Sequence, residues 1–268
     1  MSETVPFATK QPPLRPCALE EGHDRRERQR SGLWSCTLTT VTPLCIQSHY
    51  SKLTDKDPAF VPASSIRGMV RNMMEMLGAG CARFYQAHCP EHLQQCNAEA
   101  ACLACRVFGF VDGDYGWAGK VRFSDTAPVK IAWVRYAAPV EGRPPQNESH
   151  GSGWILFPHT KPALRQDPRG ARCIPEGQSF PFRIEYLNLD AEEYALFKFA
   201  LTLKHTSLDA ATGRPIDLCH KLGFAKALGL GSCTISITKD KSPEIGAEID
   251  PYLKTPAFTV FATHRRYR

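Results

Sequence analysis

The sequence predicts an α+β fold with a ferredoxin-like or RRM-like βαββαβ core. Two observations carry this prediction: segments with alternating apolar and polar residues, and two segments whose apolar residues recur at helical spacing. Along the chain they occur in the order strand, helix, strands, helix, glycine-rich loop, strand, which is typical of an antiparallel sheet with helices on one face. With 268 residues, the chain can bury a sizeable core as a single domain, 1–268.

The first strand begins near Leu33, where Trp34, Cys36 and Leu38 alternate with Ser35, Thr37 and Thr39, and Pro43 marks its end. A helix is expected in 61–77, with Ser64 or Ser65 as its N-cap and Gly78 and Gly80 after its end. Its apolar positions follow the helical period: Ile66, Val70, Met73 and Leu77.

Three further strands are expected at 120–124, 153–157 and 180–186. In the last of them Phe180, Phe182, Ile184 and Tyr186 alternate with polar residues or proline. A second helix is expected at 191–203, with Asp190 as N-cap. A final strand, 233–237, follows the glycine-rich loop.

The remaining segments do not fit the core pattern. Residues 1–31 are rich in proline and then strongly charged, which predicts an extended N-terminal arm that is either solvated or a nucleic-acid-binding arm. Residues 128–178 are rich in proline and glycine, which predicts an insertion of loops or a protruding, thumb-like hairpin.

The charge balance favours a polyanionic partner, since Lys and Arg exceed Asp and Glu by 33 to 27 and the net charge is +6. The N-terminus lacks an apolar signal core, and no run approaches the roughly 18 apolar residues of a membrane span. We therefore expect a soluble cytoplasmic protein with no membrane partner.

Eleven cysteines are present, and an odd count in a reducing compartment argues for free thiols rather than disulfides. Five of them fall within 81–105, so residues 78–106 are predicted to be a zinc-binding insertion. The C-x2-C pair Cys102 and Cys105 would supply two thiolates for a structural Zn²⁺, completed by Cys89 and Cys96. The alternates are Cys81, His88 and His92, and free cysteines in a helical hairpin are the other interpretation.

The stretch HKLGFAKALGLGSCTISI (220–237) places three glycines just before a strand. It matches neither a P-loop nor a dinucleotide-binding motif, both of which lead from a loop into a helix. Two interpretations stay open. The loop is either a nest of backbone amides for an anion, with Lys221 and Lys226 nearby, or a turn that serves sheet geometry alone.

Five segments together resemble one known family: TLTTVTPLCI (37–46), VPASSIRGMVRNMMEML (61–77), CLACRVFGF (102–110), AGKVRFSD (118–125) and the glycine-rich stretch 220–237. They resemble the RAMP proteins of CRISPR–Cas systems, most closely the backbone-type subunits of type III and related class 1 effector complexes. The segment FRIEYLNLDAEEYALFKFALTL (182–203) is similar to the same group.

The resemblance implies a subunit that binds a CRISPR guide RNA along its phosphates, positions complementary target RNA, and stacks on copies of itself and on other effector subunits. The thumb-like insertion would interrupt the guide–target duplex. The residues that would bind RNA lie at the start of the first helix and around the glycine-rich loop: Ser64, Ser65, Arg67, Arg71, His220, Lys221, Lys226, Gly229, Gly231 and Ser232.

Cleavage of target RNA is a further implication, because family members that cut use an aspartate between the first strand and the first helix. Asp55 and Asp57 occupy that loop here and could bind Mg²⁺ or Mn²⁺. The family's glycine-rich loop start is replaced by IQSHYSKLTDKD (46–57), so an RNA-binding structural role is favoured over a metal-dependent endoribonuclease.

Two alternatives stay open. A metal-independent RAMP endonuclease that processes CRISPR RNA would use a histidine as general acid or base, and His49 and His220 are available. A non-catalytic, zinc-stabilised scaffold that binds no nucleic acid would also fit the composition.

Overall fold

The computed structural model describes residues 3–6, 30–46, 54–78, 80–81, 96–97, 99–137, 153–157, 159–204, 218–238, 245, 247–255, 258–259 and 262. Its centre is a five-stranded antiparallel sheet with the spatial order β10-β11-β2-β9-β5. The strands are β2 (Arg30–Thr40), β5 (Val121–Phe123), β9 (Ser179–Leu189), β10 (His220–Lys221) and β11 (Ser232–Ile237). An α+β protein with an antiparallel sheet is confirmed.

The two longest strands, β2 and β9, pair in the register that their alternation predicts. Trp34 lies opposite Ile184 and Leu38 opposite Phe180, and all four side chains are buried. A period of two places every second residue on one face of the sheet, so this single register buries the apolar set of both strands. The opposite face carries polar side chains and the exposed Leu33 and Leu187.

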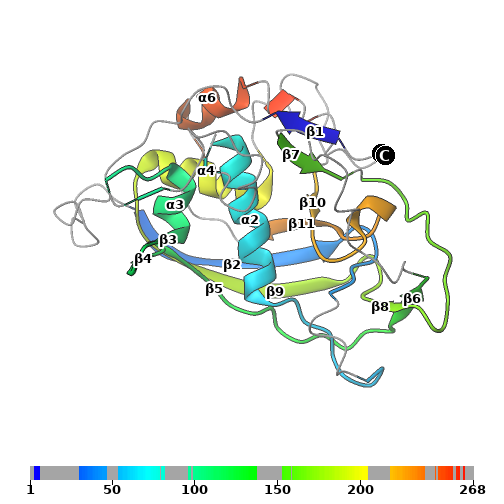
Figure 1. Cartoon of the computed structure of the whole chain (residues 1–268). Coiled ribbons are helices and arrows are strands. Elements are labelled where there is room, and N and C mark those ends of the chain that lie inside the picture. The colour runs from blue at the N-terminus through cyan, green and yellow to red at the C-terminus, as the bar shows by residue number, and fades with distance from the viewer. Residues whose placement is uncertain are drawn as a thin grey trace.

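Helices α2 (Ala63–Leu77) and α4 (Ala191–Thr202) cover the buried face of the sheet (Figure 1). The expected apolar positions of α2 are all buried. Asp190 is the N-cap of α4: its carboxylate accepts the amide of Glu193, whose side chain accepts the amide of Asp190 in return. The two predicted helices and the predicted cap of the second helix are therefore confirmed.

Short elements surround this core. Strands β1 (Glu3–Pro6) and β7 (Gly153–Leu156) pair with each other, as do β3 (Gly109–Asp112) and β4 (Tyr115–Ala118), and β6 (Val134–Tyr136) and β8 (Ala171–Cys173). The short helices are α3 (Leu103–Phe108), η4 (Lys226–Leu228), η5 (Ala247–Ile249) and α6 (Asp250–Leu253).

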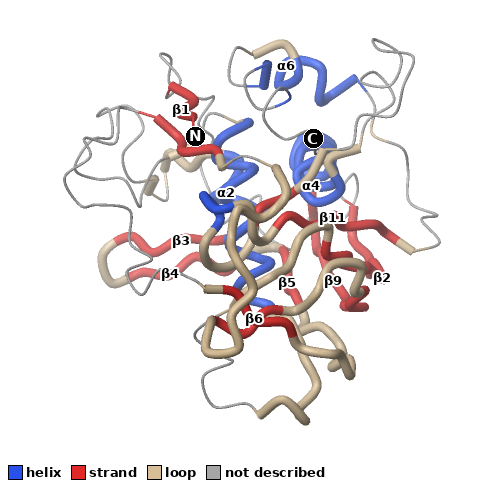
Figure 2. The backbone as a smooth tube through the Cα atoms, turned by 90° about the vertical axis from the view of Figure 1, so that its right-hand side faces the viewer, coloured by secondary structure: helices blue, strands red, loops and turns tan. Residues whose placement is uncertain are grey.

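The segment expected at 153–157 is therefore a strand, but it pairs with residues of the N-terminal arm instead of joining the central sheet. In the insertion, β6 and β8 lie below the helical layer (Figures 1 and 2), and the Leu44–Ile174 bridge joins the residue after β8 to the segment that follows β2. Residues 138–152, where the tip of a thumb-like hairpin would fall, lie outside the described residues. The arm, the insertions and their boundaries remain predictions.

Candidate metal centre and the glycine-rich loop

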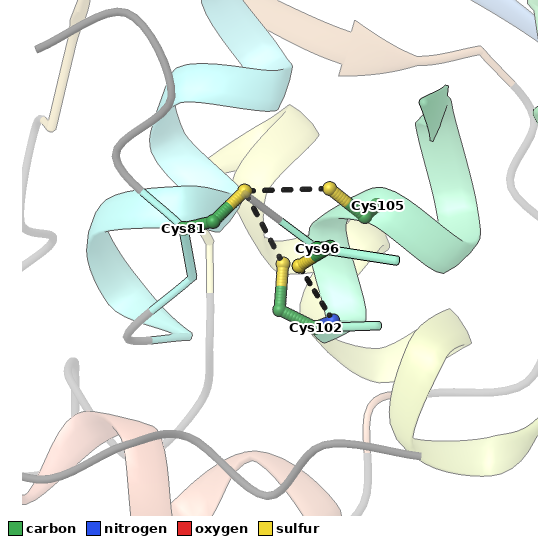
Figure 3. Close-up of side chains that lie close together, drawn as sticks. All are labelled: Cys81, Cys96, Cys102 and Cys105. Atoms are coloured by element: carbon green, nitrogen blue, oxygen red, sulfur yellow. Dashed lines mark hydrogen bonds between the residues drawn. The ribbon is translucent and has the colours of Figure 1, made fainter. Parts of the chain in front are cut away.

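Four buried cysteines converge between the end of α2 and the start of α3: Cys81, Cys96, Cys102 and Cys105 (Figure 3). Their sulfur atoms all lie within 4.8 Å of one another. A tetrahedral Zn²⁺ with Zn–S distances of about 2.3 Å would require sulfur–sulfur distances of about 3.8 Å. The Sγ of Cys81 lies 3.4 Å from that of Cys105 and 3.9 Å from that of Cys102, so the donor set fits a metal such as zinc.

Local backbone structure brings these sulfurs together. Cys102 is the N-cap of α3, which places Cys105 one turn later on the same side. The amide of Cys102 donates to the Sγ of Cys96 at 3.2 Å. Gly78 ends α2, and the amide of Gly80 donates to the carbonyl of Glu75, which turns the chain so that Cys81 faces α3.

The structure includes Cys81 among the four, whereas the sequence favoured Cys89 and kept Cys81 as an alternate. Cys89, His88 and His92 lie outside the described residues. The spacing alone could not rank Cys81 above Cys89, because the choice depends on how α2 ends.

Within the cluster the thiols form hydrogen bonds with one another. Hydrogen bonding to Cys105 lowers the pKa of Cys102 well below the ordinary thiol value, while hydrogen bonding to Cys102 raises the pKa of Cys105. A thiolate is the form that binds a metal, so metal binding would release protons from these cysteines.

Arg71 lies beside this cluster instead of at the surface. One guanidinium nitrogen, Nη2, lies 3.4 Å from the Sγ of Cys105, and Nη1 donates to the carbonyl of Gly109 at 2.8 Å. Nε pairs with Glu75 at 2.7 Å. An N–H donor stabilises the negative charge of a thiolate, so Arg71 supports the cysteine cluster.

Arg67, one turn earlier on α2, donates to the carbonyl of Phe108 and stacks over its ring at 5.4 Å. Both arginines thus fasten α2 to the end of α3. That they bind RNA phosphates remains a prediction, and in this structure their guanidinium groups donate to carbonyl groups of the protein.

A buried ion network that the sequence did not reveal joins the same region to α4. Arg106 donates to Glu193 at 2.8 Å and to Asp190 at 2.9 Å, and Lys120 contacts Glu193 at 2.8 Å. The Glu193 side chain is only 1% exposed, so its charge depends on these two cations. Arg106 lies within the cysteine motif and Lys120 is the third residue of AGKVRFSD, but no local signal in either motif points to a carboxylate about 70 residues or more away.

The glycine-rich loop is packed against its own chain. Gly231 has φ +78° and Gly229 has φ +92°, and both are buried. A Cβ on Gly231 would collide with the carbonyl oxygen of Leu222, and one on Gly229 would lie 2.9 Å from the carbonyl oxygen of Lys161. These glycines therefore allow close backbone approach within the protein.

The amides of these glycines are engaged as well. Gly231 donates to the carbonyl of Pro43 at 2.9 Å and Gly229 to that of Lys226 at 3.3 Å. That they receive RNA phosphates remains a prediction, whereas the contacts within the chain are those of a loop that serves sheet geometry, the other interpretation left open by the sequence.

Three polar side chains near the loop are also buried. Lys221 donates to the carbonyl of Leu230 at 2.9 Å, His220 to that of Leu201 at 2.9 Å, and Ser232 shares a 3.1 Å hydrogen bond with His159. Each therefore lies in the interior instead of on an RNA-facing surface. Lys226 is half-buried, and its ammonium group lies 5.7 Å from the centre of the Phe157 ring.

At the start of α2 the N-cap is Pro62, not Ser64 or Ser65, which lie within the first turn. The carboxylate of Asp125 accepts the amide of Ala63 at 2.7 Å. A side-chain anion from the segment after β5 thus occupies a position at this helix end where a phosphate was expected. Ser64 remains exposed.

The two loop aspartates make contacts within the protein. Asp55 pairs with Arg135 and Arg172, each at 3.0 Å. Asp57 accepts the amide of Thr54 at 2.6 Å and its hydroxyl at 2.8 Å, which lowers the pKa of the Asp57 carboxyl. They face arginines and a turn instead of converging on a shared cation position.

Among the residues that the structure describes, no helix combines the length and the apolar character needed to cross a membrane.

The fold and the cysteine cluster together define an α+β protein with a central antiparallel sheet and a candidate metal centre at the helix α2–α3 junction. The model of the RAMP superfamily matches residues 37–234, more than half of the chain, so the chain belongs to that superfamily. The match confirms the resemblance found in the sequence motifs.

Solved structures similar to this chain include a Type IV-B CRISPR complex and Csc2 of Thermofilum pendens. A Type IV-B CRISPR complex shows 19% identity and a TM-score of 0.45, with 79% of this chain and 92% of that chain covered. Csc2 of Thermofilum pendens shows 13% identity and a TM-score of 0.41, with 90% of this chain and 74% of that chain covered. The chain matches no curated protein sequence at a significant level.

Proposed function

We propose that this chain is a guide-RNA-binding backbone subunit of a class 1 CRISPR effector complex in the cytoplasm. It oligomerises along the guide with copies of itself and with other effector subunits, and it positions complementary target RNA. The observation that carries this proposal is the RAMP superfamily match across residues 37–234. The net charge of +6 supports a polyanionic partner.

The core of the subunit is a ferredoxin-like βαββαβ unit. In chain order it comprises β2, α2, β5, β9, α4 and β11, and in space the strands lie in the order β11-β2-β9-β5. All neighbouring pairs are antiparallel, and β9 separates β2 from β5, which is the split βαβ arrangement of this fold.

The RNA phosphates contact side chains on the exposed rim of the glycine-rich loop, because the loop amides themselves are engaged. The amide of Ala163 donates to the carbonyl of Leu228 at 3.2 Å, which joins this loop to the insertion. Lys161 and Arg165 are exposed on that segment, and Lys226 lies on the adjoining loop. Such contacts fix register without reading bases, as a subunit that serves any guide requires.

The four-cysteine cluster holds a structural Zn²⁺. Four buried thiolates leave no open coordination position for a substrate, and four sulfur donors favour zinc over Mg²⁺ or Ca²⁺. The metal would fix the end of α2 against α3 and has no direct role in RNA binding.

Binding is favoured over metal-independent processing, because the candidate acid–base residue His220 is buried and bonded to Leu201. His49 lies outside the described residues.

The test measures RNA affinity in the purified full chain as a function of salt. Lys161→Ala combined with Lys226→Ala should weaken binding of a single-stranded guide about tenfold or more. The slope of log affinity against log salt should fall by about 1.4, at roughly 0.7 per phosphate contact. The matched control is Arg122→Ala with Arg183→Ala, which removes two exposed cations from the open face of the sheet.

Control affinity should stay near that of the unmodified chain. An equal loss of RNA affinity in both double variants would show that net charge, and not the position of the lysines, determines binding. Unchanged affinity in the Lys161/Lys226 variant would overturn the proposed surface. A chain that neither binds RNA nor forms longer oligomers on it would overturn the function itself.

A further inference from the structure

Cys45 and Cys173 form a second buried cysteine group, separate from the four-cysteine cluster. Cys45 follows β2 and Cys173 ends β8, in the insertion, and with Leu230 they form a small apolar cluster apart from the main core. The two thiols lie close enough to influence each other's pKa, and the Cys173 thiol donates to the carbonyl of Ala171 at 3.5 Å.

Backbone geometry places these two residues opposite each other. Leu44 and Ile174 form an antiparallel bridge that exchanges both hydrogen bonds, from the Leu44 amide at 2.9 Å and from the Ile174 amide at 2.8 Å. An antiparallel ladder continued from this bridge would place Cys45 opposite Cys173 at the next position, as a non-hydrogen-bonded pair. The Cys45 carbonyl accepts the amide of Phe224 at 2.8 Å instead, as such a pair allows.

A non-hydrogen-bonded antiparallel pair suits a disulfide. Its Cα atoms lie about 4.5 Å apart, inside the range of about 4.4–6.8 Å that disulfides occupy. The two cysteines can therefore be joined without moving the backbone far.

We propose that Cys45 and Cys173 form a reversible disulfide that fastens the insertion to the core beside the glycine-rich loop. The bond would connect the segment after β2, which contacts the loop through Phe224, to β8, whose Arg172 pairs with Asp55. It therefore covalently joins two segments that noncovalent contacts already hold together. The inference does not depend on the proposed function.

The oxidant is hydrogen peroxide. The Cys45 thiolate attacks one peroxide oxygen, the O–O bond breaks and hydroxide leaves, so Cys45 becomes a sulfenic acid. The Cys173 sulfur then attacks the Cys45 sulfur, the S–S bond forms and the S–O bond breaks. The two thiol protons leave with the two oxygens, so two thiols and one peroxide yield one disulfide and two water molecules.

We assign the first attack to Cys45, because hydrogen bonding with Cys173 lowers the pKa of Cys45 and the pKa of Cys173 is raised. Both thiols are buried, and Cys173 belongs to the β6–β8 ribbon, which has three residues in each strand and is a small unit whose local opening admits a small oxidant.

The test uses metal-loaded full chain treated with equimolar hydrogen peroxide under native conditions. The remaining thiols are then blocked with N-ethylmaleimide and the protein is digested without reductant. Mass spectrometry should find a Cys45–Cys173 linked peptide two hydrogens lighter than the sum of its thiol forms, and dithiothreitol should abolish it. The oxidised chain should unfold about 5 °C or more above the reduced chain.

Cys173→Ala should lose both the link and the peroxide-dependent gain in melting temperature, while zinc content stays unchanged. The buried sheet cysteines Cys36 and Cys233 report whether the protein has unfolded during the reaction. They should react with N-ethylmaleimide only after unfolding. The inference is overturned if both Cys45 and Cys173 remain thiols, if the link needs denaturant to form, or if other cysteine pairs form equally well.

Discussion

The cysteine cluster and the glycine-rich loop are the two most unusual segments of this sequence, and the structure uses them in opposite ways. The cysteines bring four sulfur donors within 4.8 Å of one another, an arrangement suited to a metal. The glycines bring backbone against backbone within the chain, with Gly231 beside Leu222 and Gly229 beside Lys161.

The difference lies in how many functions a residue type can serve. Packing alone does not require four buried thiols to face one another, so their convergence marks a candidate metal site. A glycine with positive φ is needed wherever two backbones meet closely, whether the second belongs to a ligand or to the same protein. A glycine motif therefore identifies a close approach without identifying the partner.

The largest expected effect comes from the metal ligands. Cys81→Ser should abolish stoichiometric zinc binding and lower the free energy of unfolding by several kcal/mol, because the remaining three thiolates no longer close the tetrahedron. Cys89→Ser should retain zinc, since Cys81 completes the described set. Metal analysis of the purified chain and chemical unfolding measure the two outcomes.

Chelation supplies the control for this comparison: removing zinc from the unmodified chain should reproduce the Cys81→Ser stability, and restoring it should reverse the loss. Zinc retained in Cys81→Ser but lost in Cys89→Ser would give the ligand position to Cys89.

The next effect tests the loop. Gly231→Ala places a Cβ at φ +78° against the carbonyl of Leu222, so we expect a loss of about 3 kcal/mol or more in unfolding free energy from strain and collision. Zinc content should stay unchanged, because the loop and the cysteine cluster are separate. Urea unfolding with metal analysis checks both.

Gly68→Ala is the matched control for this change, since the structure shows open space around a Cβ there and alanine favours a helix. It should be neutral or slightly stabilising. If Gly231→Ala kept full stability and lost only RNA affinity, the loop backbone would face RNA after all.

Much of the core could be predicted from local pattern. The alternation of β2 and β9 fixes which side chains are buried, and the period of α2 and the Asp190 cap of α4 mark the helices. These features depend on neighbouring residues, so a single sequence contains them.

The functional assignment of the polar residues could not be predicted in the same way. Arg71 reaches Cys105, Asp125 accepts the amide of Ala63, and Glu193 holds Arg106, and each contact joins segments 34 or more residues apart. A local motif shows that a charged residue is present. Whether that residue contacts a ligand or another residue of the protein depends on the tertiary fold.

The smallest expected effect concerns Asp55. The sequence suggested this residue as a ligand of a catalytic metal, whereas in the structure it forms ion pairs with two arginines. Its carboxylate pairs with Arg135 and Arg172 but its side chain is 61% exposed, so Asp55→Asn should cost about 1 kcal/mol or less in unfolding free energy. Screening should reduce the difference from the unmodified chain at 1 M salt, where the Debye length is about 3 Å. Urea unfolding at low and high salt measures this. Metal-dependent RNA cleavage that the unmodified chain performs and Asp55→Asn loses would instead show that the Asp55 carboxylate leaves its arginines to bind a catalytic cation.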